Sequence, residues 1–331
     1  MEDTGLAEVV PGIWRLPVPL PGHSVGHVNV YALVSDGGVL LVDSGWAMPG
    51  SWAAVDDLLR RVGSAAEQVA LVLVTHFHPD HCGLAGAFQR RRGVQVGMHA
   101  ADACRLGDRF FAWDSLAKDT VGWLTSAGAP EDAIDSGVRI VEQAAGRVAP
   151  VEPDRLIEDG EVVAFGDWRL RALHTPGHTP GHLCFHEQTT GTLFSGDHVL
   201  SFINTSPGLR PHSTEDPVGD YLDSLPRLSA LEVDWVLPGH QLPFVGLGPR
   251  LDQLRAHHEE RMAETCRLLA AGPATAWEVT SRVPRSRGWD AFSNAARISA
   301  LGETYGHLRH LVARGTAVGP AGPARTFELA R

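Results

Sequence analysis

Cysteine is scarce in this sequence, and no two cysteines form a Cys-x-x-Cys pair. The four cysteines are Cys82, Cys104, Cys184 and Cys266. Their number and spacing argue against a disulfide-stabilised scaffold and against a zinc site built from thiolates. Long apolar runs are also missing, because no segment approaches the about 18 uninterrupted apolar residues of a membrane span. We therefore expect no membrane partner.

A secretory signal is missing as well. Met1 to Thr4 are acidic where such a signal would be basic and then apolar, so we predict a cytoplasmic protein. The 22 prolines and 36 glycines show no repeat, which excludes collagen-like and low-complexity chains. With 44% hydrophobic residues among 331, the chain is long enough to bury a large core.

The charge is acidic and unevenly distributed, with a formal net value of −11. Residues 250–331 contain 12 arginines, no lysine and 8 acidic residues, whereas residues 1–249 contain 16 basic and 31 acidic residues. Sequence-independent binding of nucleic acid depends on neutralising phosphates. The composition therefore disfavours a nucleic-acid partner, although it does not exclude a local basic patch.

Hydrophobic periodicity predicts strands and helices that alternate through two successive halves. The predicted strands cover 12–18, 27–34, 39–42, 69–74, 161–173, 182–186, 192–195 and 234–237. The predicted helices cover 51–62, with Ser51 at the N-cap, and 218–231. The unbroken apolar run over 69–74 is typical of a strand buried on both faces. This order predicts an α/β fold with four layers arranged αββα.

The sequence changes character after residue 248. Helical patterns over 251–271, 276–283 and 294–314 precede a hairpin pattern over 316–329, which is the outline of a small winged-helix-like domain. We therefore predict a catalytic domain over 1–248 and a winged-helix-like domain over 249–331. The helical interval at about 100–150 is expected to be a lid inserted into the first of these domains.

The strongest chemical signal follows the buried strand over 69–74. The segment from Thr75 to His81 contains His76, His78, Asp80 and His81. Imidazoles packed this closely would leave ring nitrogens unsatisfied unless something organises them. A divalent metal does so, because it accepts each nitrogen lone pair and balances the carboxylate charge. In a bent loop, His76 and His78 can face one side while Asp80 and His81 face the other. One short segment could therefore provide ligands to two metal ions.

Three further motifs place a histidine or an aspartate just past a predicted strand, where open α/β sheets position their sites. They are the proline-rich run 174–182 with His178 at its centre, Ser195-Gly196-Asp197, and Leu237-Pro238-Gly239-His240. His182 ends the same run as His178, and we interpret it as a buried structural histidine.

The ordered set His76-x-His78-x-Asp80-His81, His178, Asp197 and His240 resembles the metallo-beta-lactamase fold superfamily over about residues 10–245. The resemblance implies a first metal held by His76, His78 and His178. It implies a second metal held by Asp80, His81 and His240, with Asp197 and a hydroxide bridging the two. Zinc is the expected metal, with iron and manganese as alternatives. Asp43 matches the family's aspartate that orients a ligand histidine.

Differences from known branches of this superfamily narrow the choice of subfamily. Asp197 argues against a true beta-lactamase, since those enzymes lack the bridging aspartate, and His78 replaces the glutamate of the diiron flavoproteins. The 42 residues between Asp197 and His240 are too few for the insert of mRNA-processing nucleases. Glyoxalase II and lactamase-beta-like hydrolases with a winged-helix extension are closest in outline. Lys118 is the only lysine, however, so the tail lacks the Lys and Tyr pattern of glutathione-thioester binding.

The predicted function is hydrolysis of a thioester, ester or lactone of a small molecule by the bridging hydroxide, with one metal in place of an oxyanion hole. Asp80 or a metal-bound water would protonate the leaving group, and Asp197 would bridge the metals. A phosphodiesterase or single-strand endoribonuclease is the alternative, and a non-catalytic DNA-binding regulator is a second one. The sequence leaves a monomer and a homodimer open.

Candidate substrate contacts lie outside the ligand motifs. His23 lies on a loop that can overhang the metals in this fold, and His212 is a second candidate. Phe110, Phe111 and Trp113 fall in the predicted lid, where they would form an apolar wall of the pocket.

Overall fold

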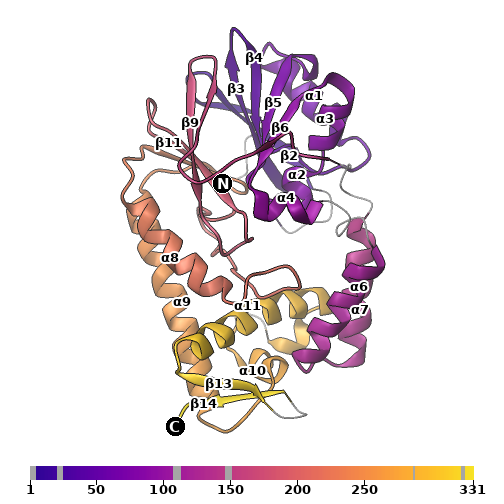
Figure 1. The fold of residues 1–331 in the computed structure, drawn as a ribbon, viewed down its shortest axis with the longest axis vertical. Coiled ribbons are helices and arrows are strands. Elements are labelled where there is room, and N and C mark those ends of the chain that lie inside the picture. Colours follow the sequence, from indigo (N-terminus) through magenta and orange to yellow (C-terminus); the bar gives the residue numbers. More distant parts are fainter. Residues whose placement is uncertain (1–4, 21–24, 107–112, 146–150, 286–287, 322–324) are drawn as a thin grey trace.

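The computed structural model describes residues 5–20, 25–106, 113–145, 151–285, 288–321 and 325–331 (Figure 1). The first half forms a seven-stranded sheet in which spatial order follows chain order. Its strands are β1 (Ala7–Val10), β2 (Ile13–Pro19), β3 (His27–Ser35), β4 (Gly38–Val42), β5 (Val69–Leu73), β6 (Gln95–Met98) and β7 (Arg155–Leu156). Neighbours from β1 to β4 pair antiparallel, and those from β4 to β7 pair parallel.

The second half forms a five-stranded sheet in the order β12-β11-β10-β9-β8. Its strands are β8 (Val162–Phe165), β9 (Trp168–His174), β10 (Leu183–Glu187), β11 (Thr192–Gly196) and β12 (Trp235–Pro238). The single strand predicted over 161–173 is wrong. Gly166 adopts a φ of 52°, which favours glycine in a tight turn, and Phe165 pairs with Trp168 across it.

Helices cover the outer faces of the two sheets. The first sheet is covered by α1 (Ser51–Arg61) and α3 (Ala85–Arg92), with the short α2 (Pro79–Cys82) and α4 (Ala100–Leu106) beside them (Figure 1). The second sheet is covered by α8 (Pro217–Ser229) and α9 (Leu247–Leu269). Ser51 is not the N-cap of α1: Gly50 occupies that position with a φ of 87°, and no side chain caps the helix. Among the described residues, no helix is both long and apolar enough to cross a bilayer.

Strand β5 shows how the layers are built. Leu71 and Leu73 pack between the two sheets, whereas Val72 and Val74 pack under the outer helices. Because successive side chains of a strand alternate between its faces, an unbroken apolar strand serves both cores. The observed architecture is the predicted four-layer αββα sandwich.

The remaining helices form a third body beneath the sandwich (Figure 1). Its elements are α6 (Trp113–Ser126), α7 (Glu131–Ala145), α10 (Ala276–Arg282), the 3₁₀ turn Trp289–Ala291, α11 (Asn294–Ala313) and the hairpin of β13 (Ala317–Ala321) and β14 (Thr326–Leu329). A second 3₁₀ turn, Ala66–Gln68, precedes β5 in the first half of the chain. Leu124 of α6 shares a core with Ile298 and Leu301 of α11. The predicted lid thus packs on the C-terminal helices. The winged-helix assignment and the boundary at residue 248 stay predictions.

Candidate metal centre

The ligand motifs meet at one edge of the sandwich, where the two sheets are joined by hydrogen bonds. The Leu183 N–H donates to the Thr75 carbonyl (2.8 Å), and the Asn29 N–H donates to the Gly239 carbonyl (2.7 Å). The Tyr31 hydroxyl donates to the Pro238 carbonyl (2.8 Å). These bonds tie the loop after β5 to β10 and the end of β12 to β3, so each ligand loop is fixed to the other sheet.

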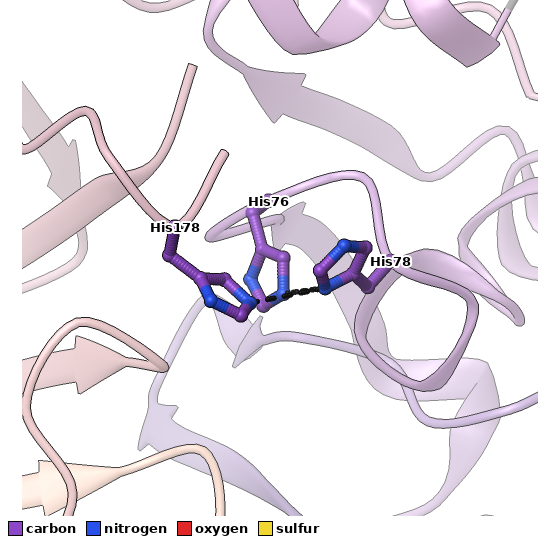
Figure 2. Close-up of side chains that lie close together, drawn as sticks. All are labelled: His76, His78 and His178. Atoms are coloured by element: carbon purple, nitrogen blue, oxygen red, sulfur yellow. Dashed lines mark hydrogen bonds between the residues drawn. The ribbon is translucent and has the colours of Figure 1, made fainter. Parts of the chain in front are cut away.

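The first group of side chains consists of His76, His78 and His178. Figure 2 shows their rings turned toward one another from two separate loops. His76 Nε2 lies 3.0 Å from His78 Nδ1, and His178 Nε2 lies 3.1 Å from the same His78 nitrogen. Three ring nitrogens therefore converge on one point.

The second group consists of Asp80, His81 and His240. His240 Nε2 lies 3.2 Å from Asp80 Oδ2, and His81 Nε2 lies 3.8 Å from the same oxygen. All the donor atoms of this group lie within 4.8 Å of one another. It therefore presents one carboxylate oxygen and two imidazole nitrogens.

Asp197 lies between the two groups. Its carboxylate oxygens are 3.6 Å from His178 Nε2, 3.6 Å from His81 Nε2 and 3.5 Å from His240 Nε2. It also forms a compact donor group with His76 and His81. Asp197 therefore lies close to imidazole nitrogens of both groups, and its bridging role stays a prediction.

Several buried nitrogen and oxygen atoms that could bind a metal have no hydrogen-bond partner in the described part of the chain. His81 Nε2 and Asp197 Oδ1 are two of them. A buried polar atom without a partner is costly. A Cβ on Gly239 would lie 2.6 Å from His81 Cε1 and 2.7 Å from Asp197 Oδ1, so glycine leaves the space between these donors open. The convergence of imidazole and carboxylate donors fits divalent metal ions.

The pKa values of part of the ligand set suit this assignment. Burial, followed by repulsion from neighbouring histidines, lowers the pKa values of His78 and His178 to about 3. Burial raises the pKa of Asp80, but His81 and the hydrogen bond from His240 outweigh it and hold that pKa well below its usual range. At neutral pH the two imidazoles are therefore neutral and the carboxylate is ionised, which are the forms that bind a metal.

The pKa of His81 is shifted in the opposite direction. Burial lowers this pKa, but the carboxylates of Asp197, Asp43 and Asp80 outweigh burial and raise the pKa to about 10. This ligand would therefore release a proton on binding a metal.

Two buried residues orient ligands from behind. Asp43 Oδ2 accepts a hydrogen bond from His81 Nδ1 (2.7 Å), so the Nε2 of that ring faces the donor group. His182 is fully buried, as interpreted from the sequence. Its Nε2 accepts the Asp197 N–H (3.2 Å), and its Nδ1 contacts the Thr175 hydroxyl (2.9 Å).

Replacing Asp43 with asparagine is expected to lower metal affinity by about 10- to 100-fold. Asp43 Oδ1 also accepts the Thr75 N–H (2.8 Å), and Oδ2 also accepts the Thr75 hydroxyl (3.0 Å). An amide cannot accept at both positions, so His81 loses its fixed orientation or Thr75 loses a partner. Competition with a metal chelator measures the affinity. The exposed Asp57 of α1 provides the control Asp57→Asn, and equal affinities in both variants would contradict the role of Asp43.

A third buried carboxylate, that of Asp102 in α4, was not predicted from the sequence to support the site. It is fully buried and accepts hydrogen bonds from the Phe77 N–H (3.0 Å), the Thr179 hydroxyl (2.7 Å) and the Gly181 N–H (2.6 Å). Asp102 thus joins the loop of His76 and His78 to the loop of His178. Nothing in the local sequence marks it, because its partners lie far along the chain.

A pocket of about 690 Å³ opens beside the first ligand group. His78, Asp80 and His178 are among its lining residues, and many of the others are apolar, including Trp46, Phe77, Leu116, Trp123, Ile140, Val141 and Ile298. Helices α6 and α7 supply several of its lining residues, and the assignment of this segment as a lid stays a prediction. His212 also lines the pocket.

The other candidate substrate contacts are not placed in this pocket. His23, Phe110 and Phe111 lie outside the described residues, and Trp113 is described only as the first residue of α6. Arg210, which the sequence interpretation missed, does line the pocket. Its charge contributes to lowering the pKa of His178, so a cation lies close to the ligands.

Comparison with known proteins gives consistent matches. The family model for the metallo-beta-lactamase superfamily matches residues 23–240. The acyl-coenzyme A thioesterase MBLAC2 of Gallus gallus is 30% identical over 230 residues, which cover 66% of this chain and 74% of that protein. The probable metallo-hydrolase YqjP of Bacillus subtilis is 25% identical over 299 residues, 89% of each chain.

A solved structure matches almost the whole chain. The metallo-beta-lactamase family protein TTHA1429 from Thermus thermophilus superposes with a TM-score of 0.85 and 32% identity, over 97% of this chain and 100% of that one. The similarity therefore includes the C-terminal helices as well as the sandwich.

Proposed function

Because the chain belongs to the metallo-beta-lactamase superfamily and is a metal-dependent hydrolase, we propose that it hydrolyses acyl thioesters at a binuclear metal centre. The observation that carries this proposal is the pocket of about 690 Å³, which joins an apolar wall to three of the ligand side chains. Such a pocket suits an acyl chain whose carbonyl carbon reaches the ligands. The thioesterase name of the chicken relative supports the same substrate class.

Two divalent ions held by the ligand groups, most simply zinc, would supply a hydroxide near neutral pH and stabilise the charge on the attacked oxygen. The chain itself does the positioning. Asp197 holds the two groups together, Asp43 fixes the His81 ring, and His182 fixes the Asp197 backbone. Helices α6 and α7 shield the acyl chain from water.

Asp80 is the carboxylate that both belongs to a ligand group and lines the pocket. The carboxylate is ionised at neutral pH, so we assign it to pass on to the leaving group the proton that the attacking water gives up. A thiolate needs this help less than an alkoxide does, since a thiol has a pKa of about 8.5. A site whose carboxylate holds no proton of its own therefore suits thioesters better than simple esters or lactones.

The test is a substrate panel with the zinc- or manganese-loaded protein. The panel contains acyl-CoA thioesters of several chain lengths, an ester, a lactone and bis(p-nitrophenyl) phosphate. The proposal predicts the highest kcat/KM on a thioester. Turnover of the phosphodiester without any acyl turnover would contradict it and favour the phosphodiesterase alternative.

Ile140 provides a test of the acyl pocket itself. It lines the pocket from α7 with 41% of its surface exposed, so its replacement should not disturb the core. Because burying an isoleucine is worth about 1.5–3 kcal/mol, Ile140→Asp is expected to raise KM for long acyl chains about tenfold or more and to leave short chains unchanged. Val121 of α6 is 39% exposed and does not line the pocket. Val121→Asp is therefore the matched control, and identical kinetics of both variants would contradict the placement of the chain.

A further inference from the structure

A second pocket, of about 1000 Å³, lies among α9, α11 and the segment that follows α10. Two arginines line it, Arg261 of α9 and Arg285 just after α10. We call it the arginine pocket. No residue of the candidate metal centre lines it, and the hydrolytic chemistry makes no use of it.

The two guanidinium groups are held by backbone atoms. Arg261 Nη1 donates to the Pro284 carbonyl (3.4 Å), and its buried Nε has no hydrogen-bond partner among the described residues. Arg285 Nη1 donates to the carbonyls of Thr280 (2.6 Å) and Val283 (3.1 Å). Within the described ranges neither arginine forms an ion pair with a carboxylate. Their charges are therefore available to an anion from outside the chain.

One carboxylate lines the same pocket. Glu303 of α11 lies 3.4 Å from His257 Nε2. Burial lowers the pKa of Arg285, and the charge of Glu303 acts against this lowering. Among the described residues, Glu303 forms no hydrogen bond with either arginine. Both arginines therefore keep N–H donors for a ligand that enters the pocket. Planar guanidinium groups recognise phosphate groups, with two parallel N–H donors each.

The arginine pocket adjoins the acyl pocket across α11. Ala295 and Ser299, one helical turn apart, line both pockets. Both residues are small and exposed, so a thin ligand can cross the helix there. Ile298 lies on the acyl side of this ridge, and Glu303 and His307 lie on the arginine side.

We propose that the arginine pocket binds the phosphate groups of a phosphorylated thiol carrier such as coenzyme A, whose flexible arm crosses the Ala295–Ser299 ridge to bring the thioester to the candidate metal centre. This inference rests on the proposed thioesterase function and extends it to the part of the substrate that is not cleaved. It also explains how an acidic chain accommodates a polyanionic substrate, because the two arginines form a local cationic site.

The experiment uses the full-length protein and two thioesters with the same acyl group, one on coenzyme A and one on N-acetylcysteamine, which has no phosphate. The double variant Arg261→Met/Arg285→Met is expected to raise KM for the coenzyme A thioester about tenfold or more and to leave kcat unchanged. The N-acetylcysteamine thioester should show no change. Arg255→Met, at an exposed position of α9 outside the pocket, is the matched control.

A second variant avoids any loss of backbone contacts. Ala296→Trp places a bulky group at an exposed position of α11 that lines the arginine pocket but not the acyl pocket, and it is expected to impair the coenzyme A thioester selectively. Unchanged kinetics on both thioesters in the double variant and in Ala296→Trp would overturn the inference while the thioesterase function stood.

Calorimetric titration with free coenzyme A distinguishes a failure of the arginine-pocket inference from a failure of the thioesterase proposal, because binding can be measured without turnover. Weaker binding in the double variant than in Arg255→Met supports the arginine pocket even if no thioester is hydrolysed. Inorganic phosphate that binds as tightly as coenzyme A would overturn the carrier assignment and identify a site for free phosphate.

Discussion

Replacing Asp197 with alanine is expected to lower kcat/KM by about 10³-fold or more while the fold persists. The carboxylate lies within 3.6 Å of imidazole nitrogens from both ligand groups, so its loss uncouples them. The loss of this carboxylate also removes a negative charge that would balance the positive charge of the metal ions beside the buried imidazoles.

The fold should survive this change because the backbone of Asp197 carries its structural bonds. Its N–H donates to His182 (3.2 Å) and its carbonyl accepts the Thr205 hydroxyl (2.8 Å), and both bonds remain in an alanine variant. Steady-state kinetics with saturating metal, alongside thermal unfolding, separate the two effects. Asp223→Ala, at an exposed position of α8, is the control. Near-normal turnover of the Asp197 variant would show that its bridging role is misassigned.

The second large effect is expected at Asp102. Asp102→Ala leaves two backbone N–H groups and one hydroxyl without their buried acceptor, and each such group costs about 1–3 kcal/mol. We expect the free energy of unfolding to fall by about 3–5 kcal/mol. Metal affinity should fall as well, because the loop of His76 and His78 is no longer tied to that of His178. Urea unfolding measures the loss, and Asp119→Ala, an exposed change on α6, should cost almost nothing.

The pH dependence provides an independent signature of Asp102. Burial, partly opposed by its hydrogen bonds, raises its pKa to about 6, above the about 3.9 of an unfolded chain. The folded state therefore binds this proton more tightly. The resulting stability is fully present below pH about 4 and is lost as the pH rises through about 6.

Asp102→Asn removes this titration. In metal-free protein, the unfolding free energy of the wild type relative to Asp102→Asn should decrease from pH 4 to pH 7. A difference that stays constant over this range would contradict the raised pKa.

Local sequence signals account for much of the fold and of the candidate site. Only one or two residues separate the end of an apolar run from His76, Asp197 and His240, so each ligand could be placed just past a strand end from its own neighbourhood. The two-faced burial of β5 followed from its unbroken apolar pattern in the same way.

Features that depend on distant contacts could not be predicted. Asp102 accepts hydrogen bonds from groups up to 79 positions away, and Arg210 lines the pocket together with distant residues of α6, α7 and α11. Local backbone geometry caused the smaller errors in the predicted helix and strand boundaries. Gly50, and not Ser51, is the N-cap of α1, and a turn at Gly166 divides the strand predicted over 161–173.

Elemental analysis of protein purified without chelators tests the central claim most directly. Seven side chains from separate loops converge on one edge of the sandwich, and the account predicts about two divalent ions per folded chain, zinc first and iron or manganese otherwise. Asp197→Ala should retain fewer. A correctly folded protein that retains no transition metal, even after incubation with zinc and removal of the excess, would contradict the account.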